Sequence, residues 1–409
     1  MPIQSVVTGV GAISPLGFSS AELFDSLLNK TRAIDQQAIL EAKGFQNITA
    51  AMINSLSNSS YNLDTFKENR GLALAYHAAR QALENAGISI STENIKTRQE
   101  IPVFLGTCMG ESPIFEGIAA NKNTDNTPLN YQAGLGNVYT SALAEVLQLH
   151  GPQRTYTCAC ASGNYAIGYA AEFVQQGFCK QILAGGVDSF SNIAHLGFMR
   201  SRAMSEQGCR PFDTSRDGMT MGEGAAFFII ENKEHALKRG ATIYAEIGGL
   251  GLSCDAFHPT SPDKTGEGMA HAMNLALNKS TLETDAIGWI SAHGTGTPVA
   301  DAAECKAINS IFSNKPPYIS SIKGAIGHSL GAASALEVAV CIEALKRQII
   351  PPNIGLNSFD QTLAVSEKYF PVEPYDTQGN MRYALNCAYG FGGMNSALVI
   401  GADPLVPGN

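Results

Sequence analysis

The segment TCACASGNYAIGYAAEFVQQ at residues 157–176 places a cysteine directly before a run with helical periodicity over 161–176. A short apolar run at 181–183 follows and is separated from the helical run by Gly177. Short apolar runs bounded by glycine are typical of buried strands. The segment therefore predicts a helix that packs against a buried sheet, with Cys160 at the start of the helix.

The same alternation of strands and helices extends outward along the chain. Helical periodicity recurs at residues 71–86, 268–277 and 331–346. Short apolar runs that predict strands lie at 4–7, 102–105, 226–230, 289–291 and 397–400. Strands that alternate with helices favour an α/β fold with buried, largely parallel sheets.

Two internal similarities bear on how the chain is divided. The sequence VTGVG at 7–11 resembles IGGLG at 247–251, and 224–230 resembles 393–400. Both comparisons place a repeat boundary near residue 245. On these residues alone, a duplication and a chance match are equal alternatives.

The composition excludes several classes of protein. The chain has 409 residues, a net charge of −9, 44% hydrophobic and 15% charged residues, which is typical of a folded enzyme. An acidic chain lacks the basic face of a nucleic-acid binder. No apolar run reaches the about 18 residues of a membrane span, and the N-terminus does not resemble a signal peptide. We expect a cytoplasmic protein.

Metals and common cofactors are not expected either. The nine cysteines are spread along the chain and predict reduced thiols, not a disulfide framework. Cys158 and Cys160 have no second close pair that would complete a zinc site. The segment GVG at 9–11 is one glycine short of a dinucleotide fingerprint, and a Walker A lysine motif is missing.

Three residues form a candidate catalytic set. The start of a helix favours the thiolate of Cys160, although a buried structural cysteine would give the same pattern. His293 ends a short apolar strand, where α/β folds place ligands, and His328 lies on a second glycine-rich turn. One cysteine and two histidines on separate turns predict a nucleophile with its bases, and hence an enzyme.

Two further segments allow more than one interpretation. Gly390, Gly392 and Gly393 surround Phe391 and form either a hinge that aims backbone amides at an oxyanion or a strand-entry turn. The sequence GHSLG at 327–331 matches the nucleophile elbow of α/β-hydrolases. No histidine follows His328, so a hydrolase triad cannot be completed.

Taken in order, these motifs resemble the β-ketoacyl-acyl carrier protein synthases of the type I/II branch, in the thiolase-like superfamily. The resemblance covers nearly the whole chain and includes RPFDTSRDG at 210–218 and DAFH at 255–258. It implies a duplicated five-layered α-β-α-β-α fold with halves 1–245, which carries the nucleophilic cysteine, and 246–409, which carries both catalytic histidines. It also implies an obligate dimer, either a homodimer or a heterodimer with a chain-length-factor-like subunit.

The resemblance assigns a role to each candidate residue. Cys160 is the acylated nucleophile, His293 and His328 complete a Cys-His-His triad, and Lys323 lies close by. Glu304 is the carboxylate partner of Lys323, and Glu337 belongs to the supporting network. The remaining residues implied are the oxyanion-hole amides of Cys160 and Phe391, the gating residues Gly390, Phe391, Gly392, Gly393 and Asp255, the phosphopantetheine-binding Thr295 and Thr297, and the carrier-docking Lys67 and Arg70.

The implied reaction is a decarboxylative Claisen condensation between an acyl group on Cys160 and malonyl-acyl carrier protein, in fatty-acid or polyketide synthesis. The only cofactor is the phosphopantetheine that the carrier brings. Three features depart from the fatty-acid pattern and favour a polyketide or aryl-polyene pathway: the sequence GTGT that follows His293, and the residues Met394 and Cys158. The alternatives are a thiolase, with Cys387 as its second cysteine, and a non-catalytic chain-length factor, which usually lacks the nucleophile.

Overall fold

The computed structural model describes residues 4–36, 49–63, 66, 69–89, 100–121, 135–313 and 315–402. Its main strands are β1 (Ser5–Ile13), β4 (Val103–Gly106), β5 (Gln153–Tyr156), β6 (Gln181–Asp188), β8 (Gly224–Asn232), β9 (Ala245–Cys254), β10 (Ile287–Ser291), β11 (Tyr318–Ser320), β14 (Tyr383–Gly390) and β15 (Met394–Ala402). Short strands are β2 (Asp35–Gln36), β3 (Thr49–Ala51), β7 (Met221–Gly222), β12 (Ile349–Ile350) and β13 (Tyr375–Asp376).

The helices fall between these strands, as the alternation predicts. They are α1 (Ser20–Leu28), α3 (Arg70–Asn85), α5 (Ser112–Asn121), α6 (Gly136–Val146), α7 (Ser162–Gln175), α8 (Asn192–Arg200), α9 (Lys233–Lys238), α10 (Glu267–Ser280), α11 (Pro298–Phe312), α12 (Lys323–Ile326) and α13 (Ala333–Arg347). The four helices predicted at 71–86, 161–176, 268–277 and 331–346 are confirmed to within a few residues as α3, α7, α10 and α13.

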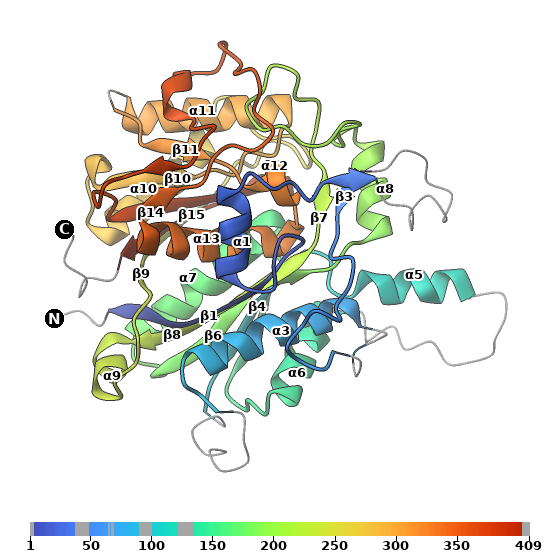
Figure 1. Ribbon diagram of the computed structural model, residues 1–409, viewed down its shortest axis with the longest axis vertical. Coiled ribbons are helices and arrows are strands. Elements are labelled where there is room, and N and C mark those ends of the chain that lie inside the picture. Colours follow the sequence, from blue (N-terminus) through green and yellow to red (C-terminus); the bar gives the residue numbers. More distant parts are fainter. Residues whose placement is uncertain are drawn as a thin grey trace.

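The main strands hydrogen-bond in the order β5-β4-β6-β8-β1-β9-β15-β14-β10-β11. Among the described strands, the two halves of this sheet are joined through Ser5–Val7 of β1 and Ala245–Ile247 of β9. Each half forms its own layer, with α7 and α13 between the layers and the remaining large helices outside (Figure 1). This is the expected five-layered fold.

The expectation of largely parallel sheets is wrong. The outer strands are parallel, as in β4–β5 and β10–β11, but β6–β8, β8–β1, β1–β9, β9–β15 and β15–β14 are antiparallel. Helices cover both faces of each layer, so a strand is buried on both sides whatever its direction. The continuous apolar runs therefore carry no information about direction.

Both repeat sequences occupy matching places. A Cβ on Gly11 of β1 would overlap the carbonyl oxygen of Ala78 in α3, and a Cβ on Gly251 of β9 would overlap that of Ala272 in α10. Glycine thus lets a helix pack closely on the first strand of each half. In each half the last strand, β8 or β15, pairs antiparallel with that first strand. The boundary at residue 245 stays a prediction.

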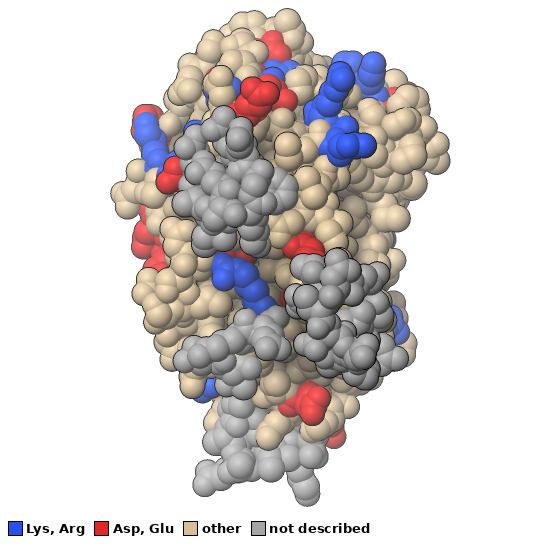
Figure 2. Space-filling view, turned by 90° about the vertical axis from the view of Figure 1, so that its right-hand side faces the viewer, with Lys and Arg blue, Asp and Glu red and all other residues tan. Residues whose placement is uncertain are grey.

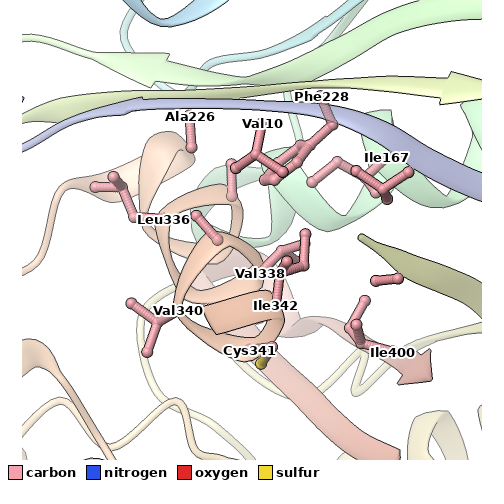
Figure 3. Close-up of a cluster of buried hydrophobic side chains, with 14 of the residues drawn as sticks. Val10, Ile167, Ala226, Phe228, Leu336, Val338, Val340, Cys341, Ile342 and Ile400 are labelled. Carbon is pink, nitrogen blue, oxygen red and sulfur yellow. The ribbon is translucent and has the colours of Figure 1, made fainter. Parts of the chain in front are cut away.

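The central helix α13 anchors the core between the layers. Its residues from Ala333 to Leu345 are all buried, as expected for a helix that is apolar on nearly every side. Figure 3 shows Leu336 and Ile342 of α13 among side chains of both layers and of α7, namely Val10, Phe228, Ile167 and Ile400. Each large side chain buried here contributes about 1.5–3 kcal/mol to folding. Within the described part of the chain, no helix is long and apolar enough to cross a bilayer.

Candidate active site

Cys160 lies in a tight turn that leads into α7. A short 3-10 turn, Ala159–Ala161, precedes the helix, and Ala159 has a left-handed φ of +50°. Ser162 holds the turn, because its Oγ donates to the Ala159 carbonyl at 2.6 Å and accepts from the Cys158 amide at 2.9 Å. The turn places the Cys160 side chain, which is only 7% exposed, at the wall of a cleft of about 300 Å³.

The cleft brings both candidate histidines to the cysteine. His328 Nε2 lies 3.0 Å from Cys160 Sγ. The rings of His293 and His328 meet edge to face with 5.3 Å between centroids. One ligand atom from each of the three residues lies within 4.8 Å of the others. Three motifs that are far apart in the sequence thus converge on one point.

Backbone contacts fix each histidine. His328 follows α12 and Gly327, whose φ of +66° favours glycine. The His328 amide donates to the Thr220 carbonyl at 2.7 Å, and its carbonyl accepts from the Gly222 amide at 2.9 Å. His293 follows β10, and Glu304 of α11 accepts the amides of His293 and Gly294, each at 2.8 Å.

The expected pairing of Lys323 with Glu304 is wrong. Lys323 Nζ forms its ion pair with Glu337 of α13, and both side chains are 1% exposed. The two oxygens of Glu304 are already occupied by the amides of the His293 turn. Burial raises the pKa of Glu337 to about 7, and the charge of Lys323 opposes this rise. Glu337, on the central helix, is therefore the carboxylate that faces the lysine.

Both histidines are neutral in this site. Burial lowers the pKa of His293 and of His328 well below 6.5, and the nearby charge of Lys323 lowers both further. Neutral imidazoles can donate a hydrogen bond from one ring nitrogen while accepting at the other.

The expectation of a thiolate at the helix start does not describe the resting site. Burial raises the pKa of Cys160 to about 12, although the charge of Lys323 opposes the rise. Desolvation of the charged sulfur therefore outweighs the stabilisation that a helix start offers. The resting form is a thiol beside a neutral imidazole.

The glycine-rich segment after β14 closes against the nucleophile. A Cβ on Gly390 would lie 2.8 Å from Ala159 Cβ and 3.2 Å from the Cys160 amide nitrogen, so only glycine fits without displacement. Gly392 and Gly393 have φ of +83° and +75°. Phe391, between Gly390 and Gly392, is 37% exposed and packs edge-on against Phe198 of α8.

The second expected gating segment lies beside the first. The Asp255 amide donates to the Gly393 carbonyl at 2.9 Å, and the Gly392 amide donates to the Pro259 carbonyl at 2.8 Å. The carboxylate of Asp255 accepts from Asn395 Nδ2 at 2.6 Å. The structure therefore ties the loop that starts at Asp255 to the glycine-rich segment.

Thr295 and Thr297 line the same cleft. Their hydroxyls lie 2.9 Å apart. Asp301 of α11 holds this turn, since its Oδ1 accepts the amides of Thr295 and Gly296 at 3.1 Å. Both threonines thus lie in the cleft that Cys160 lines.

Arg70, one of the two expected docking residues, is not a free basic group. Arg70 Nε donates to buried Glu223 at 2.8 Å, and its Nη2 donates to the Ile53 carbonyl at 2.6 Å. The charge of Arg70 is therefore compensated inside the molecule. Lys67 lies outside the described residues.

Known proteins match nearly the whole length of the chain. The family model for the β-ketoacyl synthase N-terminal domain matches residues 4–236, and that for the C-terminal domain matches 244–357. The chain is 31% identical to 3-oxoacyl-acyl-carrier-protein synthase 2 of Vibrio harveyi, over 96% of this chain and 97% of that protein. The chain belongs to the β-ketoacyl synthase family.

Solved structures agree with this β-ketoacyl synthase assignment. The ishigamide ketosynthase/chain length factor superposes with a TM-score of 0.89 and 31% identity, over 98% of this chain and 100% of that one. A type II polyketide ketosynthase, solved in complex with its acyl-carrier protein and bound to the hexaketide, superposes with a TM-score of 0.87 and 25% identity, over the same shares.

One residue that positions this β-ketoacyl synthase site was missed from the sequence. Asp188 ends β6, is fully buried, and accepts from the Thr107 hydroxyl and from the amides of Cys108, Met109 and Gly331. It joins the turn after β4 to the loop after His328. The available signal was an acidic residue directly after a continuous apolar strand.

Proposed function

We propose that this chain catalyses the decarboxylative condensation of an acyl thioester, held on Cys160, with malonyl-acyl carrier protein. The observation that carries the proposal is the convergence of Cys160 Sγ, His328 Nε2 and the His293 ring in one cleft. The reaction needs no cofactor besides the phosphopantetheine of the carrier, for which Thr295 and Thr297 supply hydroxyls along the cleft.

In the first half-reaction, Cys160 takes the acyl group from a carrier thioester. Sγ attacks the carbonyl carbon while its proton moves to His328 Nε2, 3.0 Å away. The amides of Cys160 and Phe391 stabilise the oxyanion. The bond from carbon to the carrier sulfur then breaks, and the carrier thiol leaves with the proton.

In the second half-reaction, malonyl-carrier protein loses CO2. Neutral His293 and His328 donate hydrogen bonds to the thioester oxygen and so stabilise the enolate that forms as the carbon–carbon bond breaks. The enolate carbon attacks the acyl carbonyl on Cys160, and the Cys160 thiolate leaves and takes a proton from solvent. Burial and the neighbouring Lys323 support this step, because they keep both imidazoles uncharged.

The alternatives receive less support. A thiolase would need a second cysteine at the reacting centre, and Cys387 is fully buried in β14 and does not line the cleft. A non-catalytic chain-length factor would lack the nucleophile, whereas Cys160 is present beside both histidines. Three sequence features favour polyketide or aryl-polyene synthesis over housekeeping fatty-acid elongation: the sequence GTGT that follows His293, and the residues Met394 and Cys158.

The molecule also offers surfaces for the expected partners. Strand β5 is the last strand of its layer, Gln153 and Arg154 are exposed, and Phe178 nearby is 64% exposed and stacks on Phe173. An edge strand beside exposed aromatic surface suits a second subunit, either a copy of this chain or a chain-length-factor-like protein. Light scattering of the purified chain, alone and with such a subunit, separates the two.

An acidic carrier needs basic charge near the cleft. Arg202 lines the cleft and is exposed, and Arg200 ends α8 close by in the chain. Figure 2 shows Lys and Arg side chains as separate groups on one face of the molecule, the largest of them at the upper right. Our candidate contact for the carrier is Arg202 at the cleft, since the charge of Arg70 is compensated by Glu223.

Intact-mass spectrometry tests the proposed function. The chain is incubated with acyl-carrier protein and then with malonyl-carrier protein. Acylation of Cys160, followed by its discharge into a product two carbons longer with release of CO2, is expected. Cys160→Gln is expected to abolish condensation and to retain malonyl decarboxylation, whereas a thiolase would show no decarboxylation. Short, long and aryl-polyene acyl groups then identify the pathway.

A further inference from the structure

The three residues of the triad also form a donor set for a soft divalent metal ion. A cysteine sulfur and two imidazoles offer ligand atoms that all lie within 4.8 Å of one another, and each residue is more than nine-tenths buried. Among the described residues, no other trio of His, Cys, Asp or Glu converges in this way. Three such ligands with an open fourth position are the arrangement of many zinc sites.

The ligands are held in place before any metal arrives. Glu304 fixes the backbone of His293, while the Thr220 carbonyl and the Gly222 amide fix that of His328. The Nδ1 atoms of both histidines are buried without a hydrogen-bond partner. Tetrahedral Zn²⁺ with bonds of about 2.0–2.3 Å holds its ligand atoms about 3.5 Å apart, so ligand atoms that lie within 4.8 Å of one another have to approach by about 1 Å to close around the ion.

The surroundings allow a cation to enter. The ion pair with Glu337 offsets part of the nearest fixed positive charge, that of Lys323. The cleft in front of the triad provides both an entry path and room for a water molecule as the fourth ligand. Sulfur and imidazole nitrogen prefer Zn²⁺ to Mg²⁺ or Ca²⁺, which select oxygen ligands.

We propose that Cys160, His293 and His328 bind one Zn²⁺ ion and that the occupied site cannot be acylated. The S–H bond of Cys160 is replaced by an S–Zn bond, the proton passes to solvent, and nothing is oxidised or reduced. Metal and acyl group compete for the same sulfur, so zinc is a reversible inhibitor. The inhibition rests on the proposed function, whereas the binding does not.

Cobalt substitution tests the binding directly. The full chain, reduced and freed of metal with a chelator, is titrated anaerobically with Co²⁺ in a buffer without thiols. We expect one equivalent of Co²⁺ to produce a thiolate-to-cobalt charge-transfer band and the visible bands of a tetrahedral ion, and Zn²⁺ to abolish both. Cys160→Ala loses the charge-transfer band, and His293→Ala or His328→Ala weakens binding by at least about 10-fold.

The neighbouring cysteine supplies the matched control. Cys158 lies two residues from Cys160 and outside the donor set, so Cys158→Ala is expected to bind Co²⁺ like the unchanged protein. A charge-transfer band that persists in Cys160→Ala, or no band in the unchanged protein, overturns the proposal. Circular dichroism establishes that each variant is folded.

A second measurement requires no variant. Zn²⁺ is expected to slow alkylation of Cys160 by iodoacetamide by at least about 10-fold, because a sulfur bound to the metal is a poorer nucleophile. The exposed thiol of Cys254 serves as the internal reference and should react at an unchanged rate. Equal slowing at both cysteines, or no slowing at Cys160, contradicts the proposal even if the chain proves to be a condensing enzyme.

Discussion

The carboxylate of Asp188 accepts the amide of Gly331 at 2.7 Å, so the end of β6 holds the loop that carries His328. The same carboxylate accepts three donors from Thr107, Cys108 and Met109. It is an acceptor for four donors from two separate segments beside the nucleophile. Asp188 therefore acts through the backbone and positions His328 without touching substrate.

Replacing this carboxylate by an amide should disturb both segments. Asp188→Asn turns two acceptor sites into donors that face other donors, and we expect it to destabilise the protein by about 1–3 kcal/mol. Displacement of His328 should lower kcat/KM for condensation by about 10- to 100-fold. Urea unfolding and a condensation assay measure the two effects. Asp285→Asn, at an exposed position, is the control, and equal behaviour of both variants would contradict the positioning role.

The pH dependence of decarboxylation should report the neutral histidines. Their pKa values are lowered by burial and by Lys323, so protonation, with loss of activity, is expected only below the usual histidine range. In the double variant Lys323→Met/Glu337→Gln the charge of Lys323 is gone while burial remains. The pKa values should rise, and the acid limb of the pH–rate profile should move to higher pH.

A surface ion pair provides the control for this experiment. Lys279 and Glu172 pair at 2.8 Å with side chains that are 50% and 30% exposed. The double variant Lys279→Met/Glu172→Gln removes one positive and one negative charge from a far more exposed pair. The acid limb of its pH–rate profile should coincide with that of the unchanged protein. An acid limb that does not move in Lys323→Met/Glu337→Gln would mean that burial alone keeps the histidines neutral.

Gly390 and Gly392 should differ sharply in how well they tolerate replacement by alanine. A methyl group on Gly390 would press on Ala159 and on the Cys160 amide, so Gly390→Ala should reduce acylation of Cys160 by about 100-fold or more. Nothing lies within 4 Å of a Cβ on Gly392, where only the φ of +83° opposes a side chain. Gly392→Ala should therefore be milder, with an effect near 10-fold or about 1–2 kcal/mol. Rapid-quench mass spectrometry of acyl transfer measures both, and equal rates would exclude the steric explanation.

Replacing a glycine that lets a helix pack closely on a strand should lower the stability of the protein. Gly251→Ala forces a methyl group into the Ala272 carbonyl of α10, and we expect a loss of about 1–3 kcal/mol or more. Gly197→Ala lies in α8 with nothing near the added group and should stabilise by about 0.5–1 kcal/mol. Thermal or urea unfolding compares the two. A harmless Gly251→Ala would show that α10 can shift on β9.

Local patterns were enough to locate α7, which follows Cys160, and α13, which carries Glu337, because periodicity and glycine breaks are properties of short segments. They did not locate α11, which carries Glu304. The partner of Lys323 was assigned wrongly, since Glu304 and Glu337 are both plausible in sequence and only the fold shows that amides of the His293 turn occupy Glu304. The prediction of a thiolate at Cys160 was wrong for a related reason. A helix start can be read from sequence, whereas the desolvation that opposes it depends on everything packed around the sulfur.

The connection through β1 and β9 has a consequence for how the enzyme could be divided. The sulfur comes from the segment before β9, and both imidazoles come from the segment after it. In the described part of the chain, the strand pairing between the two halves consists of the three-residue β1–β9 ladder and two isolated bridges, Asp213 with Phe359 and Met221 with His328. Two polypeptides, cut in the stretch between α9 and β9, would each be inert. Their reassociation would restore activity only when α13 of one fragment packs beside α7 of the other. Recovered activity would therefore measure the association of the two fragments.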